Sequence, residues 1–273
     1  MSTPVSVCII ACNEERDLPR CLESVAWADE RIVVMDARSS DRSEALAREA
    51  GARVLLRPYD GNIEQKNFAL DQAKHDWVLA IDADEAVAPE LAEAIRRELA
   101  SPRPADGYEL DRLTFHLGRW IRHGDFHPDW QLRLFRRARG RWGGTNPHGR
   151  VQIAGEVRRL RGTLEHYSYR DLADQLARIQ DFSRIQARAL WDAGRRARWS
   201  DWLLRPPLRF LRAYVLKQGF RDGFPGFAIA AATAFHVFLK YATLRELERT
   251  GGPPGDALAP AAGKAGRSSG AQG

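Results

Sequence analysis

Short apolar runs alternate with amphipathic segments along the first hundred residues of the chain. Four runs have the length and composition of buried strands: residues 5–11, 31–35, 54–56 and 77–81. Four segments between and after them repeat apolar residues at helical spacing: 18–25, 43–50, 66–73 and 89–99. This alternation predicts an α/β fold with a mostly parallel sheet and right-handed crossovers.

The pattern changes near residue 107, where aromatic residues, Arg and Gly become frequent. Short strand candidates follow at 107–115, 130–136, 150–153 and 164–167. We expect them to form a lid or acceptor region on one edge of the sheet. From residue 171 apolar residues again recur at helical spacing, which predicts a helical extension.

The fourth predicted strand ends in two carboxylates, Asp82 and Asp84, followed by Glu85. The carboxyl end of a strand is where open α/β folds bind their ligands. Mg²⁺ is typically held by one or two carboxylates together with substrate phosphates, so this end is a candidate metal–nucleotide site. The alternative is that Asp84 and Glu85 cap the helix that starts near Pro89.

Two earlier strands end in polar residues in the same way. The first strand runs into Asn13 and Glu14, and the second ends at Asp36. Parallel strands bring all three ends to one edge of the sheet, and core packing does not readily explain such a convergence. Three unrelated helix caps are the alternative.

Composition narrows the class of partner and the compartment. The chain has 273 residues, 44% of them hydrophobic and 29% charged, with a net charge of +6, which favours an anionic partner. Nucleic acid is not expected, since no basic–aromatic module is recognisable and the acids cluster where a polyanion would lie. Three cysteines near the N-terminus suggest neither a disulfide set nor a metal knuckle, and the first residues lead straight into a strand without a signal sequence. We therefore expect a cytoplasmic protein.

The motifs resemble family 2 glycosyltransferases with a GT-A fold. The strand-end residues described above carry the resemblance over the first hundred residues. Further motifs resemble the branch that includes lipopolysaccharide-core glucosyltransferases: Gln65-Lys66-Asn67-Phe68-Ala69-Leu70, Leu117-Gly118-Arg119-Trp120-Ile121-Arg122, His127-Pro128-Asp129-Trp130, Arg133-Leu134-Phe135-Arg136 and His166-Tyr167-Ser168-Tyr169. The resemblance implies a Rossmann-like, mostly parallel sheet.

The resemblance also implies roles for individual residues. The nucleotide sugar would be bound by Asn13, Glu14, Asp36, Lys66, Asp82 and Arg133. A divalent cation, Mg²⁺ or Mn²⁺, would be held by Asp84, with Asp82 and His148 as further candidate ligands. A turn histidine without such a role is the alternative for His148.

An inverting transfer needs a base that deprotonates the acceptor hydroxyl. The candidates are Asp129 and Asp125, which lie in one loop. The alternative for Asp129 is a solvated loop acid paired with Arg133.

The segment from residue 203 to residue 241 mixes Arg with large apolar side chains. Its charge-free part, residues 224–239, is 16 residues long, about 24 Å as a helix, whereas a span usually needs about 20 residues. We expect interfacial helices on an anionic membrane surface. A helix buried in the protein, or a dimer interface, is the alternative.

Together these features predict an inverting, metal-dependent hexosyltransferase that uses a nucleotide sugar, such as a UDP-hexose, and a lipid-linked saccharide acceptor such as lipopolysaccharide core. It would be cytoplasmic and peripheral on the inner membrane. Polyprenyl phosphate or a peptide as acceptor, or a non-catalytic nucleotide-binding protein on the membrane surface, are the alternatives. The expected parts are a nucleotide-sugar half, an acceptor half, a helical membrane-associating extension and a disordered tail: 1–105, 106–170, 171–250 and 251–273.

Overall fold

The computed structural model describes residues 3–144 and 149–252 of the chain. The chain forms two compact units, and the boundary between them falls inside a strand, after Arg112. The first unit holds the residues up to Arg112 together with Asp129–Tyr167. The second unit holds Leu113–Pro128 and the helices from Ser168 onward. The predicted tail beyond residue 252 lies outside the described residues.

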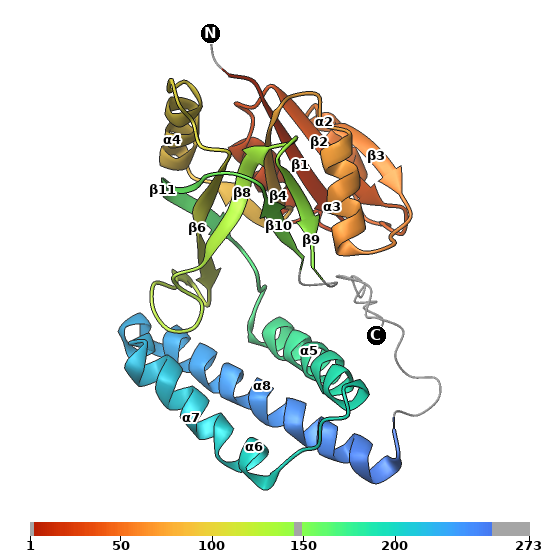
Figure 1. Cartoon of the computed structure of the whole chain (residues 1–273), viewed down its shortest axis with the longest axis vertical. Helices are drawn as coiled ribbons and strands as arrows, with labels where there is room; N and C mark the ends of the chain where they lie inside the picture. Colours follow the sequence, from red (N-terminus) through yellow and green to blue (C-terminus); the bar gives the residue numbers. More distant parts are fainter. Residues whose placement is uncertain (1–2, 145–148, 253–273) are drawn as a thin grey trace, which may run out of the picture. The chain divides into compact units, whose positions relative to one another are not determined.

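The first unit is built on four parallel strands (Figure 1). Their order across the sheet is β3-β2-β1-β4. They are β1 (Val5–Ala11), β2 (Glu30–Asp36), β3 (Arg53–Arg57) and β4 (Trp77–Asp82). The central strands are almost wholly apolar and buried, which is typical of parallel strands covered on both faces.

Helices connect these strands and cover both faces of the sheet. Leu18 and Leu22 of α1 and Leu91 and Ile95 of α4 pack into one apolar core, whereas Leu70 of α3 packs into a second. The helices of this unit are α1 (Leu18–Ser24), α2 (Ser43–Glu49), α3 (Asn62–Asp71) and α4 (Pro89–Leu99).

Antiparallel strands extend the sheet beyond β4, in the order β8-β6-β11-β5. They are β8 (Trp130–Arg136), β6 (Gly107–His116), β11 (Val157–His166) and β5 (Glu85–Val87). A separate two-stranded sheet pairs β9 (Gly140–Gly143) with β10 (Arg150–Ile153). Gly162 in β11 has a φ of 108°, and a Cβ there would lie 2.6 Å from the backbone of Leu91, so glycine permits α4 to pack closely on this strand.

The second unit is mainly helical. Its long helices α5 and α8 pack side by side around Ala187, Tyr241 and Leu244 (Figure 1). Buried Asp222 accepts hydrogen bonds from the backbone N–H groups of Arg122 and His123, which ties the segment after β6 to these helices. The elements are β7 (Arg119–Trp120), α5 (Leu172–Asp192), α6 (Trp199–Leu203), α7 (Arg205–Leu211), η1 (Arg212–Leu216), η2 (Gly219–Asp222) and α8 (Gly223–Thr250).

The predicted α/β class with a C-terminal helical extension is confirmed. The helix at 89–99 and the strands at 130–136 and 150–153 have the predicted bounds. The short strands β5, β7 and β9 were not predicted, because two to four residues carry too little periodicity. Among the described residues, one helical segment, Gly219–Thr250, is long and apolar enough by length and composition to cross a membrane.

Candidate active site

Three strand ends meet at the carboxyl edge of the parallel sheet. In the register, Ile10 of β1 lies beside Asp82 of β4, and Ala11 of β1 lies beside Met35 of β2. The loop after β1 and the carboxylates of Asp36 and Asp82 therefore lie on one edge. A sheet edge of this kind is where a parallel α/β fold can bind an anionic ligand.

Asn13 connects the first two of these loops. It has a left-handed φ of 54°, and its Oδ1 accepts hydrogen bonds from the backbone N–H groups of Ser40 and Asp41 at 2.9 and 3.3 Å. Asn tolerates this conformation better than most residues do. The Glu14 backbone N–H donates to Ser43 Oγ at 2.7 Å, so both residues hold the loop after β1 against the loop after β2.

Asp36 is buried at the end of β2 and is bound by a residue of its own loop. The Arg38 guanidinium donates to both carboxylate oxygens, and the Arg38 backbone N–H donates to Oδ1 at 2.9 Å. The hydrogen bonds from Arg38 hold the pKa of Asp36 below its usual value. Arg38 also lies over the ring of Tyr59, with 5.0 Å between the guanidinium carbon and the ring centroid. This corner therefore presents a fixed carboxylate, a half-exposed guanidinium and an aromatic face.

A chain of alternating charges crosses the unit from α3 to the loop before β8. Lys66 Nζ lies 2.7 Å from Asp82 Oδ1, and Arg133 Nη2 lies 2.9 Å from both Asp82 Oδ2 and Glu85 Oε1. Arg112 Nη1 lies 3.2 Å from the same Glu85 oxygen. Arg112 also pairs with Asp129, which is the last member of the series. Three cations therefore alternate with three carboxylates. We call Lys66, Asp82, Arg133, Glu85, Arg112 and Asp129 the charge chain.

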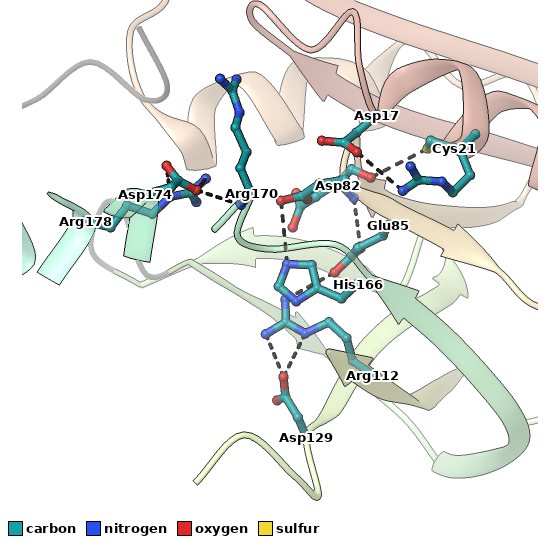
Figure 2. A network of polar contacts seen from close by, with 12 residues as sticks. Asp17, Cys21, Asp82, Glu85, Arg112, Asp129, His166, Arg170, Asp174 and Arg178 are labelled. Atoms are coloured by element: carbon teal, nitrogen blue, oxygen red, sulfur yellow. Dashed lines mark hydrogen bonds and ion pairs between the residues drawn. The ribbon is translucent and has the colours of Figure 1, made fainter. Parts of the chain in front are cut away.

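Asp129 is held firmly at the end of the charge chain. Arg112 Nε and Nη2 both lie 2.7 Å from its Oδ2, and Gln131 Nε2 donates to its Oδ1 at 2.6 Å. Figure 2 shows Asp82, Glu85, Arg112 and Asp129 linked in this order. The alternative partner Arg133 is wrong, because that side chain reaches Asp82 and Glu85 instead.

Asp82 remains ionised in this setting. Burial acts to raise the pKa of its carboxyl group, but the Lys66 ammonium and the Arg133 guanidinium outweigh burial and hold that pKa well below its usual range. Burial likewise acts against the charge of Arg112, whereas Glu85 and Asp129 raise the pKa of its guanidinium. The neighbouring charges of the charge chain therefore outweigh the effect of burial on both Asp82 and Arg112.

Asp84 lies next to His166, the first residue of the motif His166-Tyr167-Ser168-Tyr169. Its Oδ2 is 3.6 Å from His166 Nε2, and its backbone carbonyl accepts from the Tyr167 N–H at 2.9 Å. The helix-cap alternative for Asp84 and Glu85 is wrong. Helix α4 follows Ala88 without a side-chain cap, and Glu85 lies in β5 and accepts the Asp82 N–H at 2.9 Å.

Two of the predicted site residues are not among the described residues of the first unit. Asp125 belongs to the second unit, where its side chain is only 5% exposed and pairs with Arg209 and Lys217 at 3.1 and 2.9 Å. His148 lies outside the described residues. Arg136, the last residue of the quoted motif that begins at Arg133, is aligned with Trp77 at the opposite end of β4 and pairs with Asp76. Within the described ranges, no group of three or more His, Cys, Asp or Glu side chains is arranged to hold a metal ion.

Glu85, Arg112 and His166 are the site residues that the sequence did not identify. Glu85 follows the carboxylate pair directly, and His166 stands in a quoted motif, so both had a local signal. Arg112 had no local signal in the sequence. The sequence of a strand alone does not tell which face of the sheet a given side chain occupies. The first unit is therefore an α/β domain that holds fixed carboxylates and cationic side chains together at one edge of its sheet.

The comparisons with known proteins give the class of enzyme. The model of the family described as "Glycosyl transferase family 2" matches residues 6–159. The chain is 32% identical to the lipopolysaccharide core biosynthesis glycosyltransferase LpsC of Rhizobium meliloti, over 88% of this chain and 92% of that protein. It is 30% identical to an uncharacterized glycosyltransferase of Rickettsia typhi, over 89% and 87% of the two chains.

Among solved structures, the chain is similar to residues 1–349 of Staphylococcus aureus TarS, with a TM-score of 0.46, 15% identity and coverage of 91% and 92%. The sequence matches decide the assignment. The chain belongs to glycosyl transferase family 2, and it is a glycosyltransferase.

Proposed function

We propose that the chain transfers a hexose from a nucleotide sugar, such as a UDP-hexose, to a lipid-linked saccharide, with inversion and with the help of a divalent cation. The observation that carries the proposal is the sheet edge where Asp36 and Asp82 lie with Lys66 and Arg133. A nucleoside diphosphate offers hydroxyl groups for carboxylates and a double negative charge for the two cations. In this proposal Asp36 binds the base or ribose.

The carboxylate chemistry of this edge suits a hard cation such as Mg²⁺ or Mn²⁺. Both oxygens of Asp82 already have cationic partners at 2.7 and 2.9 Å, so we assign the ion to Asp84. His166, 3.6 Å from Asp84, is the nearby nitrogen ligand, whereas Asp82 and His148 stay predicted ligands. A bound divalent cation would neutralise the leaving diphosphate.

Lys66 and Arg133 would exchange a carboxylate partner for the diphosphate when the donor binds. Lys66 also lies over the ring of Trp142, with 4.3 Å between Nζ and the ring centroid. The Asn67 side chain fixes that tryptophan through two backbone hydrogen bonds of 3.0 Å. The ammonium group is therefore positioned by its surroundings, which limits the entropy lost when it binds an anion.

Asp129 is the base that we favour. Its carboxylate would accept the proton of the acceptor hydroxyl while the acceptor oxygen bonds to the anomeric carbon and the nucleoside diphosphate leaves. Arg112 and Gln131 hold the carboxylate in one orientation, and positioning of this kind is needed for proton transfer. Asp125 is the less favoured candidate, because two cations neutralise its buried side chain.

The proposal for the acceptor is based on the similarity to LpsC and not on the geometry of the site. The relative LpsC is described as a lipopolysaccharide core biosynthesis enzyme. A saccharide carried on a lipid would explain basic and apolar helices on a transferase, and it would place the enzyme on the cytoplasmic side of the inner membrane. Lipopolysaccharide core is therefore the acceptor that we propose.

A donor-hydrolysis screen tests the proposal. The purified chain would be mixed with UDP-glucose, UDP-galactose, UDP-N-acetylglucosamine and GDP-mannose, with Mg²⁺, Mn²⁺ or EDTA, and released nucleotide would be measured. We expect one UDP-hexose to be hydrolysed only with metal, and this activity to be lost in Asp84→Asn. The matched control is Asp76→Asn, since Asp76 lies before β4 at the opposite end of the strand and is exposed. Equal rates in EDTA and in metal would refute metal dependence.

A further inference from the structure

The segment from residue 199 to residue 245 has an unusual distribution of charge. It contains seven basic residues and two acids, a net charge of +5. Both acids, Asp201 and Asp222, are buried, at 5% and 1% exposure. Asp201 pairs with Arg205 at 2.7 Å, and Asp222 accepts hydrogen bonds from the backbone of the β7 loop. The surface of this segment therefore presents no exposed carboxylate.

The same segment exposes large apolar side chains along one side of α7 and η1. Leu204, Leu208, Leu211 and Val215 are spaced by four, three and four residues, which puts them on one helix face. All four are exposed, Leu208 by 61%. We call them the outer stripe. Leu216, directly after it, is 77% exposed.

The opposite side of these helices packs inward. Phe210 and Tyr214 contact Phe227 of α8 with ring centroids 5.6 and 5.7 Å apart, and Ala213 is buried. The orientation of α7 is therefore fixed by aromatic packing within the second unit. The outer stripe faces away from that packing and is flanked by the exposed residues Arg205 and Arg212.

The charge-free part of α8 is a different surface. Its small and branched residues Ala228, Ile229, Ala230 and Ala232 are buried within the second unit. The same run also keeps exposed aromatic side chains, at Phe224, Phe227, Phe235 and Phe238. Further exposed apolar side chains lie on α7, η1 and η2, among the basic residues of the segment.

We propose that the outer stripe docks peripherally on an anionic lipid bilayer. The leucines would enter the boundary between head groups and acyl chains, while Arg205 and Arg212 meet lipid phosphates. Charge complementarity selects this occupant, because a second copy would bring the same positive surface against itself. The biological reason for such docking rests on the proposed lipid-linked acceptor. The surface itself belongs to the second unit and takes no part in donor chemistry.

Vesicle co-sedimentation tests this surface directly. The full chain would be mixed with vesicles of phosphatidylcholine alone or with one-third phosphatidylglycerol, at low and high salt, without a donor. We expect binding to the anionic vesicles, weakened but not abolished by salt. Leu208→Glu with Leu211→Glu should lower the partition coefficient roughly twentyfold or more. Arg212→Gln should lower it about fivefold on anionic vesicles only.

The matched control is Leu176→Glu on α5. Leu176 is also an exposed leucine of the second unit, at 38%, but it lies on a helix with exposed acids. The Leu176→Glu variant should bind to the anionic vesicles as strongly as the unchanged chain does. Circular dichroism and donor hydrolysis verify that the stripe variant is folded.

Four outcomes would overturn the proposal. The first is that the unchanged chain binds neither kind of vesicle, and the second is that the control and the stripe variant lose vesicle binding equally. The third is that alkaline carbonate does not release the bound chain. The fourth is that the unchanged chain is a dimer in solution and the stripe variant is a monomer. Resistance to carbonate would mean a spanning helix, and the dimer would mean that a second copy covers the stripe. Because binding is measured without a donor, and hydrolysis without vesicles, failure here is distinct from failure of the proposed transferase reaction.

Discussion

Glu85→Gln is the change that tests the charge chain most directly. The Glu85 side chain is fully buried and accepts hydrogen bonds from the Asp82 N–H, from Arg112 Nη1 and from Arg133 Nη2. Glutamine has the same shape as glutamate but no charge. Its NH₂ group is a hydrogen-bond donor and would face one of these N–H groups, which are donors too. The variant therefore leaves two largely buried guanidinium groups with one carboxylate fewer.

The expected loss of stability follows from these contacts. Removing one partner of a buried ion pair costs about 3–5 kcal/mol, because the remaining charge is left uncompensated. Arg133 keeps Asp82 and Arg112 keeps Asp129, so we expect a value near the lower end, about 3 kcal/mol. Natural domains have a free energy of unfolding of only about 5–15 kcal/mol, so the variant should remain folded but be clearly weakened.

Urea unfolding followed by circular dichroism measures this loss. The control is Glu44→Gln on α2, which removes an exposed ion pair with Arg48 and should cost at most about 0.5 kcal/mol. Donor hydrolysis should fall as well in Glu85→Gln, since Asp82 and Arg133 lose their common partner. An unchanged urea midpoint with an unchanged slope would refute the reasoning, because it would mean that the two guanidinium groups do not need this carboxylate.

Further predictions concern single carboxylates. Asp84→Ala should lower turnover roughly 10²-fold or more and remove the response of turnover to Mn²⁺ titration; a retained response would exclude Asp84 as the ligand. Asp129→Asn should lower kcat by about 10²–10⁴-fold at unchanged UDP affinity, and the same pattern in Asp125→Asn instead would transfer the base role. The folded pKa of Asp36 is lowered, so its contribution to stability is present above the unfolded pKa of about 3.9 and is lost as the pH falls through the folded value. Asp36→Asn should therefore be less stable than the unchanged chain at pH 7 in urea, and the difference should shrink at pH 3; an equal difference at both would contradict the assignment.

The sequence predicted the parallel half of the sheet well because each of its strands is a self-contained apolar run. Residues 77–81 need no partner to be recognised as a buried strand. β5 is three residues long and pairs with β11, where Leu164 lies beside Val87. Such a strand exists only through a partner distant in sequence, so local periodicity cannot reveal it.

The charge chain shows the same limit for side chains. Sequence proximity suggested Arg133 as the partner of Asp129, four residues earlier. In the fold Arg133 belongs to β8, whose pairing with β4 carries it to Asp82 and Glu85, and Arg112 of β6 takes Asp129 instead. Which cation pairs with which carboxylate therefore depends on strand register, which the sequence alone does not show.

Asn13 has a structural role in the loops that its place after the first strand does not reveal. It was expected beside the nucleotide because it follows the first strand. Its side chain instead binds the backbone at Ser40 and Asp41, with Asn13 itself in a left-handed conformation. Its effect on a donor would then be indirect, through the shape of the two loops that carry Asp36 and Arg38.

The helical extension shows why hydropathy summed along a sequence does not tell which side chains of a helix are exposed. In α8 a charge-free run arises because small residues such as Ala228 and Ala230 face the interior of the second unit. In α7 arginines interrupt the apolar residues, so a running average is low although Leu208 and Leu211 are exposed. A surface that meets lipid head groups needs both kinds of side chain, since apolar burial and attraction to phosphates act together. α7 has both kinds of side chain exposed, whereas the exposed phenylalanines of α8 between residues 224 and 239 have no charged residue among them.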